Sequence, residues 1–314
     1  SAINEMLDAL KRYPQLLAVI GASGSGKSSV VMAGVLPRLR AGAVTGSRDW
    51  IYAPPFTPGE HPVQNLIASL SKSLPDVGEE RIRRALTDKD PQAIGRLLRA
   101  AVYEGLKTRL VLIVDQFEEV FTQSNEDERQ QLIDLLVAAA AETNASVTVI
   151  LTLRADFFDR VLSHPILSTM ISRHNYLLRP MTTAELRESV EKPAALAGLI
   201  LETGLLEEIL LDLGDEPGSL PLLQFTLDQL YERREGRRLT LAAYKSIGGV
   251  RGALAQHAET TYNLLRSDEY RRVAQTMFLR LVEVSANDEI ARRRITRDEL
   301  TLPDPDASAM MNQV

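Results

Sequence analysis

A glycine-rich segment near the start of the chain has the composition and spacing of a phosphate-binding loop. It follows a short apolar run and reads Gly21-Ala22-Ser23-Gly24-Ser25-Gly26-Lys27-Ser28. Glycine adopts backbone angles that other residues avoid, so successive N–H groups can turn toward one phosphate, and the positive end of the following helix adds to the attraction. A flexible glycine–serine turn is the alternative, but the position after an apolar run and before a helical pattern favours the loop.

The polar groups of this loop have expected roles toward a Mg²⁺-bound nucleotide. Lys27 can bridge the β- and γ-phosphates, and the Ser28 hydroxyl can hold Mg²⁺. Ser29 belongs to the same segment, but we assign it no ligand role. The predicted nucleotide-binding segment comprises Gly21, Ser23, Gly24, Ser25, Gly26, Lys27, Ser28 and Ser29, in which Ser29 is included by its position after the motif and not as a direct ligand.

A carboxylate for the metal follows a second apolar run. Residues 110–114 are all apolar, and Asp115 comes directly after them. In P-loop NTPases an aspartate at the end of such a strand holds Mg²⁺ beside the triphosphate. We therefore predict ATP or ADP with Mg²⁺ as the cofactors, and Ser28 and Asp115 as the metal-binding residues.

The turn after Asp115 carries the candidates for a water-activating base. Many ATPases have a glutamate directly after this aspartate, but this chain has Gln116 there. Glu118 or Glu119 would then have to reach back from the following turn, and Glu118 is the preferred candidate. The alternative is that both acids only stabilise the first turn of a helix through its dipole.

A third apolar run, residues 147–153, ends at Arg154. An arginine at this strand end could sense the γ-phosphate and report its presence to the next domain. Alternatively, Arg154 pairs with Asp156 or with a helix C-terminus. The residues predicted to take part in catalysis are Lys27, Asp115, Glu118, Glu119 and Arg154.

Strand and helix patterns alternate through the first part of the chain. Continuous short apolar runs indicate strands buried on both faces, and strands separated by helices predict βαβ units in a doubly wound parallel sheet. The fold class is therefore α/β. The predicted strands are 16–20, 50–53, 110–114, 147–153 and 176–178, and the predicted helices are 1–12, 27–40, 62–104 in pieces and 126–143.

The strand signal ends near residue 182, and helical patterns follow. Only residues 289–300 alternate weakly, as in a small hairpin that leads into a helix. We predict an α/β core over 1–180, a helical lid over 181–248, and part of a third module over 249–314.

Composition narrows the function classes. The chain has 314 residues, a formal net charge of -6 and no cysteine, so disulfides and thiolate metal sites are excluded. The acidic balance argues against a nucleic-acid-binding surface over the whole molecule. No apolar run approaches the ~20 residues of a membrane span. We expect a piece of a longer cytoplasmic protein, because the chain begins at Ser1 without a methionine or a secretory signal.

These motifs together resemble bacterial STAND-class NTPases, in the branch often joined to β-propeller or other repeats. The segments that carry the resemblance are 21–28, 58–62, 115–119, 153–157, 164–165, 179–181, 218–222 and 248–249. The resemblance implies a sheet in the order 5-1-4-3-2, a helical lid and a winged-helix module that clamp the nucleotide. It also implies that Pro221 packs near the adenine, whereas the plain alternative for this proline is a helix N-terminus. The usual base-contacting segment upstream of the first helix is missing or truncated, and the winged-helix-like module is incomplete beyond Leu300.

The same resemblance implies a molecular switch. Such proteins rest closed with ADP, exchange it for ATP and oligomerise when a sensor domain is engaged, and many act in defence or signalling. We expect slow ATP hydrolysis, self-association on activation, and sensor and effector domains outside residues 1–314. A turnover ATPase, either a motor or a nucleic-acid-dependent enzyme, is the alternative; a kinase, a GTPase and a degenerate scaffold are weaker candidates.

Overall fold

The computed structural model describes residues 1–88, 90–101, 109–141, 146–214, 219–284 and 290–292. The chain divides into two units. The first unit comprises Ser1–Thr182 with Asp215–Leu220, and the second comprises Thr183–Gly214 with Pro221–Val314. The predicted end of the core at residue 180 lies beside this boundary, and the further division at residue 249 stays a prediction.

The first unit contains a five-stranded sheet in the order β2-β3-β4-β1-β5, and all neighbouring strands run parallel. Read from the other edge, this is the order 5-1-4-3-2, so the predicted fold class and strand order are confirmed. The strands are β1 (Leu16–Gly21), β2 (Ile51–Tyr52), β3 (Leu110–Val114), β4 (Val147–Arg154) and β5 (Asn175–Leu177).

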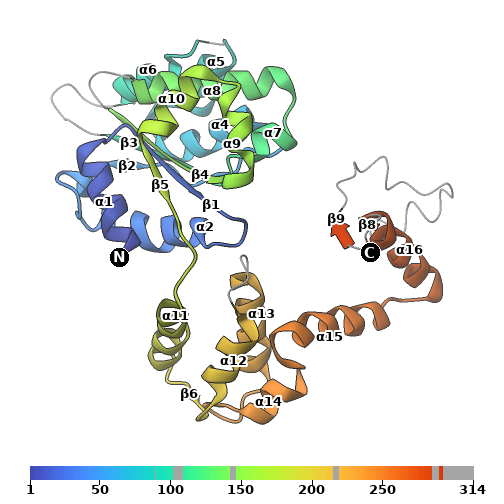
Figure 1. Cartoon of the computed structure of the whole chain (residues 1–314). Helices are drawn as coiled ribbons and strands as arrows, with labels where there is room; N and C mark the ends of the chain where they lie inside the picture. Colours follow the sequence, from blue (N-terminus) through green and yellow to red (C-terminus); the bar gives the residue numbers. More distant parts are fainter. Residues whose placement is uncertain (89, 102–108, 142–145, 215–218, 285–289, 293–314) are drawn as a thin grey trace. The chain divides into compact units, whose positions relative to one another are not determined.

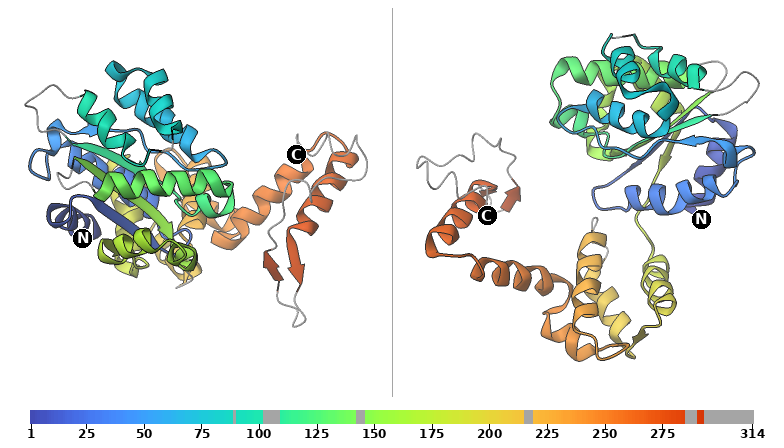
Figure 2. Two further views of the ribbon diagram at one scale, coloured as in Figure 1. Left: turned by 90° about the horizontal axis from the view of Figure 1, so that it is seen from above. Right: turned by 180° about the vertical axis from the view of Figure 1, so that it is seen from behind.

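Helices cover both faces of this sheet, as Figures 1 and 2 show. Strand β1 supplies both faces because its side chains alternate. Leu17 and Val19 pack with α1 (Ala2–Arg12) and with the helix that follows the phosphate loop. Leu16, Ala18 and Ile20 belong to the larger core on the opposite face. The helices and short helical turns of that face are α4 (Pro62–Ser73), η3 (Pro75–Val77), α5 (Glu79–Thr87), α6 (Ala93–Ala101), α7 (Glu119–Thr122), α8 (Glu126–Ala141), η4 (Ala155–Phe157), α9 (Phe158–Leu162) and α10 (Pro165–Arg173).

The helix after the phosphate loop is not a regular α-helix. The predicted helix over 27–40 is divided into α2 (Lys27–Ser29), a π-helical stretch η1 (Val30–Val35) and α3 (Leu36–Arg40), and a short turn η2 (Ser47–Asp49) follows. Gly34 lies in the π-helical stretch, where an added Cβ would meet Ile3 of α1 at 2.7 Å. Helix α1 therefore packs directly on this irregular stretch.

The second unit is mainly helical. Its helices are α11 (Thr183–Leu196), α12 (Leu205–Leu213), α13 (Leu220–Glu232), α14 (Leu241–Ser246), α15 (Gly249–Asn263) and α16 (Asp268–Arg280). The expectation of no strand between residue 182 and the C-terminal hairpin is wrong, because β6 (Ile200–Leu201) pairs parallel with β7 (Arg238–Leu239). Two-residue strands are too short to show a period of two in the sequence.

Two antiparallel strands close the described part of the second unit, β8 (Val282–Val284) and β9 (Ile290–Arg292). The sequence predicts this hairpin over 289–300, and its first strand lies earlier in the chain than predicted. Residues 293–314, which include the rest of the predicted third module, lie outside the described residues, and so does Gly218. Within the described residues, no helix is long and apolar enough to cross a membrane.

Candidate nucleotide-binding site

The phosphate loop links β1 to α2 in a conformation that needs its glycines. Gly24 and Gly26 have φ angles of 69° and 86°, in the left-handed region that favours glycine. Gly21 is needed for a different reason: an added Cβ would lie 2.9 Å from the carbonyl oxygen of Leu178 and 2.9 Å from the Ser25 hydroxyl oxygen. The loop can therefore wind closely beside β5 with its backbone amides unobstructed by side chains.

Lys27 is the first residue of α2, and its side chain is folded back into the loop. Its Nζ donates hydrogen bonds to the carbonyl oxygens of Gly21 at 3.0 Å and Ala22 at 2.7 Å. The residue is buried, and this burial lowers the pKa of the ammonium group while the nearby carboxylates of Glu118 and Asp115 oppose the shift. A buried cation whose hydrogen-bond acceptors, among the described residues, are neutral carbonyl oxygens would gain strongly from a phosphate.

The three serines beside Lys27 differ in their surroundings. The Ser25 hydroxyl oxygen is buried and has no hydrogen-bond partner in the described part of the chain. Such a group is costly unless it is paired, so its place inside the loop fits a phosphate oxygen. Ser23 and Ser29 are exposed. The predicted places of Ser23 and Ser29 in the nucleotide-binding segment stay predictions.

Ser28 and Asp115 lie together at the other side of the loop. The Ser28 hydroxyl donates to Asp115 Oδ1 at 2.7 Å, across the gap between α2 and the end of β3. Mg²⁺ prefers oxygen ligands and usually combines one or two protein groups with phosphate oxygens and water. The pair therefore has the donor set expected for the metal.

Thr152 is a member of this site that our sequence analysis did not select. It is fully buried on β4, and its hydroxyl donates to the same Asp115 Oδ1 at 2.6 Å. A signal was present, because alternate residues of a strand share a face. Thr152 therefore shares the face of Ile150, and Asp115 follows two residues after Ile113. Ile150 and Ile113 belong to the same core cluster, which also contains residues of α1.

Gln116 turns the chain sharply after Asp115. It is the only described residue other than glycine with a positive φ, 52°. Its backbone N–H donates to the Thr152 hydroxyl at 2.9 Å, and its carbonyl accepts from Glu119 N at 2.9 Å. Its own side chain is exposed. The turn therefore points the residue next to the metal carboxylate outward and brings the following acids back.

Glu118 is the acid that this turn buries. Its Oε2 accepts a hydrogen bond from the backbone N–H of Arg154 at 3.2 Å. Burial raises the pKa of the Glu118 carboxyl, and the charges of Lys27 and Arg154 partly oppose this shift. A carboxylate with a raised pKa close to the loop lysine is a suitable group to polarise water.

Glu119 points to a different partner. Its Oε2 accepts from the backbone N–H of Gly59 at 3.0 Å, while Ser124 donates to the Gly59 carbonyl at 2.7 Å. These contacts fix Gly59, part of a segment that carried the family resemblance, to the start of α7 and to the turn after it. The geometry gives Glu119 a structural contact, and its role as a base stays a prediction.

Arg154 ends β4 beside Gly21, its register partner on β1. Its guanidinium binds both carboxylate oxygens of Asp156, from Nε at 3.1 Å and from a terminal nitrogen at 2.6 Å. The pair is partly exposed, with 27% of the Arg154 side chain accessible. Asp156 is one of the two alternative partners that the sequence suggests for Arg154. A partly exposed pair can exchange partners at low cost, so a sensor role is compatible with it.

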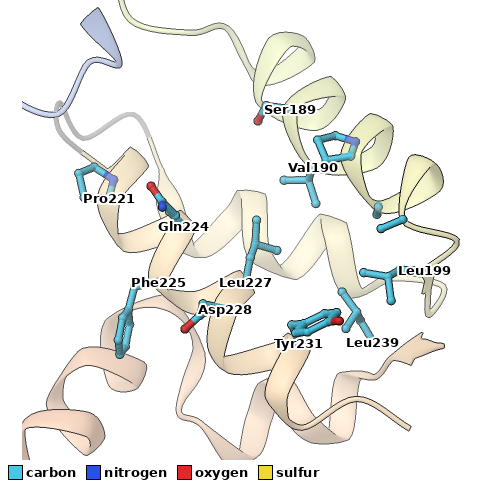
Figure 3. A pocket seen from close by; sticks show the side chains of 13 residues that line it. Ser189, Val190, Leu199, Pro221, Gln224, Phe225, Leu227, Asp228, Tyr231 and Leu239 are labelled. Carbon is cyan, nitrogen blue, oxygen red and sulfur yellow. The ribbon is translucent and has the colours of Figure 1, made fainter. Parts of the chain in front are cut away.

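Pro221 belongs to the second unit, as the second residue of α13. It lies at one end of a groove of about 740 Å³ between α11 and α13, which Figure 3 shows from close by. Apolar side chains such as Val190 and Leu227 line this groove, with Gln224 and Asp228 among its polar members. The contact between Pro221 and the adenine stays a prediction.

The parallel sheet, the glycine loop, the buried lysine and the Ser28–Asp115 pair define a P-loop NTPase. The family model described as Novel STAND NTPase 1 matches residues 1–314, and the chain belongs to this family. The predicted resemblance and the predicted nucleoside-triphosphate-hydrolysing activity are thereby confirmed. No curated protein sequence matches the chain.

Three of the solved structures with a similar fold show how distant the likeness to this chain is. The Aeropyrum pernix ORC1 protein, solved in complex with DNA, has a TM-score of 0.57 and 16% identity, covering 99% of this chain and 81% of its own. The Aeropyrum pernix ORC2 protein, solved as ADPNP–ADP complexes, has a TM-score of 0.54 and 14% identity, covering 99% and 92%. Pyrobaculum aerophilum Cdc6p has a TM-score of 0.50 and 11% identity, covering 88% and 73%. At these identities the likeness shows the fold alone.

Proposed function

We propose that this NTPase is an ATP/ADP-binding molecular switch of a signalling or defence protein. In this proposal, ATP binding and slow Mg²⁺-dependent hydrolysis are coupled to a conformational change and to self-association. The observation that carries the proposal is the state of Arg154. Its guanidinium lies at the end of the strand beside the phosphate loop and is held by Asp156, a partner it can exchange for a γ-phosphate.

The groups around the loop support binding more clearly than rapid turnover. Lys27, Ser25 and Ser28 offer donors to phosphates, and Mg²⁺, when bound at Ser28 and Asp115, would neutralise phosphate charge. Gln116 takes the place where many ATPases carry their base, and its side chain is exposed. Glu118 is buried and already accepts from Arg154 N. We expect tight nucleotide binding with slow hydrolysis.

A nucleic-acid-dependent ATPase is the second candidate, because the Aeropyrum pernix ORC1 structure of similar fold contains DNA. A phosphate backbone needs many lysine and arginine contacts. The net charge of -6 argues against an extended surface of that kind. We therefore rank the switch first, with ATP or ADP as its ligand and no nucleic acid as a required partner.

The deciding experiment measures which nucleotide the purified protein carries and what it does with ATP. The protein is denatured, and any released nucleotide is identified by chromatography. A second sample receives Mg²⁺ and ATP, with and without double-stranded DNA, while phosphate release and light scattering are recorded. The DNA is omitted in one arm so that the two candidate functions give different results.

Stoichiometric ADP, turnover well below the typical ~10 s⁻¹ of enzymes, and no response to DNA would support the switch. An increase in mass with a nonhydrolysable ATP analogue but not with ADP would support the coupling to self-association. An empty site with rapid, DNA-stimulated hydrolysis would overturn the proposal in favour of the second candidate.

A further inference from the structure

Thr152 holds the turn after β3 through two hydrogen bonds of its hydroxyl and one of its carbonyl oxygen. The Thr152 hydroxyl donates to Asp115 Oδ1 at 2.6 Å and accepts from Gln116 N at 2.9 Å. The Thr152 carbonyl oxygen also accepts from Phe117 N at 2.9 Å. A threonine hydroxyl has one proton, so the donated bond uses its whole donor capacity. The side chain is fully buried, so water cannot easily substitute for it.

Strand register explains why this residue reaches both partners. Leu151 of β4 pairs with Val114, the last residue of β3. The next residues along these parallel strands are Thr152 and Asp115, so their side chains lie side by side on one face. At this point β3 ends and the chain turns at Gln116, whose N–H would lose its partner if the Thr152 side chain were apolar.

Two hydroxyls hold the same carboxylate oxygen, but they are not equivalent. Ser28 is also a predicted metal ligand, so its hydrogen bond to Asp115 must readjust when Mg²⁺ binds. Thr152 has no such second role, and its bond to Asp115 can persist. The Thr152 hydroxyl also holds Gln116 at a φ of 52°, a conformation that residues other than glycine rarely adopt. That conformation directs the chain toward the buried Glu118.

We propose that Thr152 is a positioning residue for the NTPase reaction. Its hydroxyl orients the Asp115 carboxylate for the metal and simultaneously holds the Gln116 turn that presents Glu118. The inference rests on the metal role of Asp115 in the proposed function. The groups that hold a metal-ligating carboxylate typically affect metal affinity or activity by about 10–100-fold when they are removed.

The test compares three substitutions. Thr152→Val keeps the shape and removes the hydroxyl, whereas Thr152→Ser keeps the hydroxyl. Thr148→Val is the matched control, because Thr148 is buried on the same strand and its hydroxyl donates to the carbonyl oxygen of Pro14 at 2.5 Å, away from Asp115. The measurements are Mg²⁺-dependent binding of a fluorescent ATP analogue, single-turnover hydrolysis, and hydrogen exchange of the 115–121 amides without nucleotide.

For Thr152→Val we expect a need for about 10–100-fold more Mg²⁺ to reach half-maximal analogue binding. Hydrolysis should be slower, and the 115–121 amides should exchange faster. Thr152→Ser should restore all three readouts to within about threefold, since it keeps the donor. Thr148→Val should lower the melting temperature but leave Mg²⁺ dependence and 115–121 exchange as in the unmodified protein.

Unchanged Mg²⁺ dependence and unchanged exchange in Thr152→Val would overturn the proposal, because the hydroxyl would then only fill the core. If Thr152→Val does not fold, Thr152→Ala replaces it, with the same expected and contradicting results. If the unmodified protein shows no Mg²⁺-dependent nucleotide binding, the proposed function fails. Exchange at 115–121 in the nucleotide-free protein then still decides whether Thr152 holds the Gln116 turn, while its role toward the metal fails together with the proposed function.

Discussion

The Glu118 carboxylate accepts a hydrogen bond from the backbone amide of Arg154, at 3.2 Å between Oε2 and N. This bond joins the turn after β3 to the end of β4. The acid is buried, and its pKa is raised because burial disfavours the charged form. The turn and the strand end can therefore respond together to a change at the phosphate.

Glu118→Gln should slow single-turnover ATP hydrolysis by about 10²–10³-fold, because general-base catalysis typically contributes 10²–10⁴-fold. Nucleotide affinity should stay within about threefold, since the amide keeps the size and the oxygen acceptor of the acid. Glu119→Gln is the comparison: it weakens the contact to Gly59 and should change the rate little. Equal effects on the rate, or a slower Glu119→Gln, would remove Glu118 from the role of base.

The raised pKa of Glu118 predicts a pH-dependent stability difference. The ordinary value is 4.5, and the folded protein keeps this proton to a higher pH than the unfolded chain does. Between the two pKa values the folded state binds more protons, so the free energy of unfolding falls as pH rises through that window. Glu118→Gln lacks this titration. Its melting temperature relative to the unmodified protein should therefore be higher near about pH 7 than near about pH 4. A difference independent of pH would contradict the shift.

The centre of the sheet was predictable because β1, β3 and β4 are buried on both faces. Strand β3 matches the predicted run over 110–114, and β4 extends the run over 147–153 by Arg154 alone. Strands buried on both faces are apolar at nearly every position, so they do not alternate between apolar and polar residues, and a charged residue or a glycine marks where each strand ends. The positions of Asp115 and Arg154 at strand ends followed directly. The phosphate loop was equally predictable, because the spacing of glycines in the sequence matches the positions where the loop backbone needs a positive φ.

The finer geometry depended on contacts between distant segments. The left-handed conformation of Gln116 rests on a hydrogen bond to Thr152 on another strand, and no local pattern indicates it. The choice between Glu118 and Glu119 depends on which way that turn directs each side chain. Gln116 is also not a residue type that commonly adopts a positive φ. Reasoning from the sequence therefore left these alternatives open.

Lys27→Ala should weaken nucleotide binding by about 10- to 100-fold. A hydrogen bond to a charged group contributes about 1.5–3 kcal/mol, and 1.4 kcal/mol corresponds to a tenfold change in affinity. The measurement is a titration with a fluorescent ADP and ATP analogue. Lys192→Ala is the control, because Lys192 is an exposed residue of α11 paired with Glu188. Unchanged affinity in Lys27→Ala would exclude the loop as the phosphate site.

Gly249→Ala should destabilise the second unit more than a substitution at another glycine with positive φ. Gly249 has a φ of 68°, and an added Cβ would lie 2.5 Å from Asp212 Oδ2, which accepts from the Tyr244 hydroxyl. Gly236 has a φ of 60° with nothing within 4 Å of an added Cβ, so it isolates the backbone strain of about 1–2 kcal/mol.

We expect Gly249→Ala to cost about 1 kcal/mol beyond Gly236→Ala, because it also displaces the partly buried hydrogen bond between Tyr244 and Asp212. Denaturant unfolding followed by circular dichroism measures both free energies of unfolding. Equal losses for the two variants would show that Asp212 and Tyr244 readjust without cost, and that the glycine is required only for its backbone angle.

The Arg154–Asp156 pair predicts opposite effects of two substitutions on the preference for ATP over ADP. Arg154→Ala should lower ATP affinity by about tenfold or more and leave ADP affinity nearly unchanged, because a charged hydrogen bond to the γ-phosphate contributes about 1.5–3 kcal/mol. Asp156→Ala frees the guanidinium from a partly exposed pair that is worth about 0.2–1 kcal/mol, so ATP affinity should rise by about one- to fivefold.

Titration of both variants with nonhydrolysable ATP and ADP analogues separates these effects. Arg160→Ala serves as the control, since Arg160 is an exposed arginine on the nearby helix α9. If Arg154→Ala weakened ATP and ADP equally, the arginine would contribute to the general charge of the site and not to recognition of the γ-phosphate. A lower ATP affinity in Asp156→Ala would instead mean that Asp156 holds Arg154 in its productive position, and the pair would then be part of the ATP-bound site.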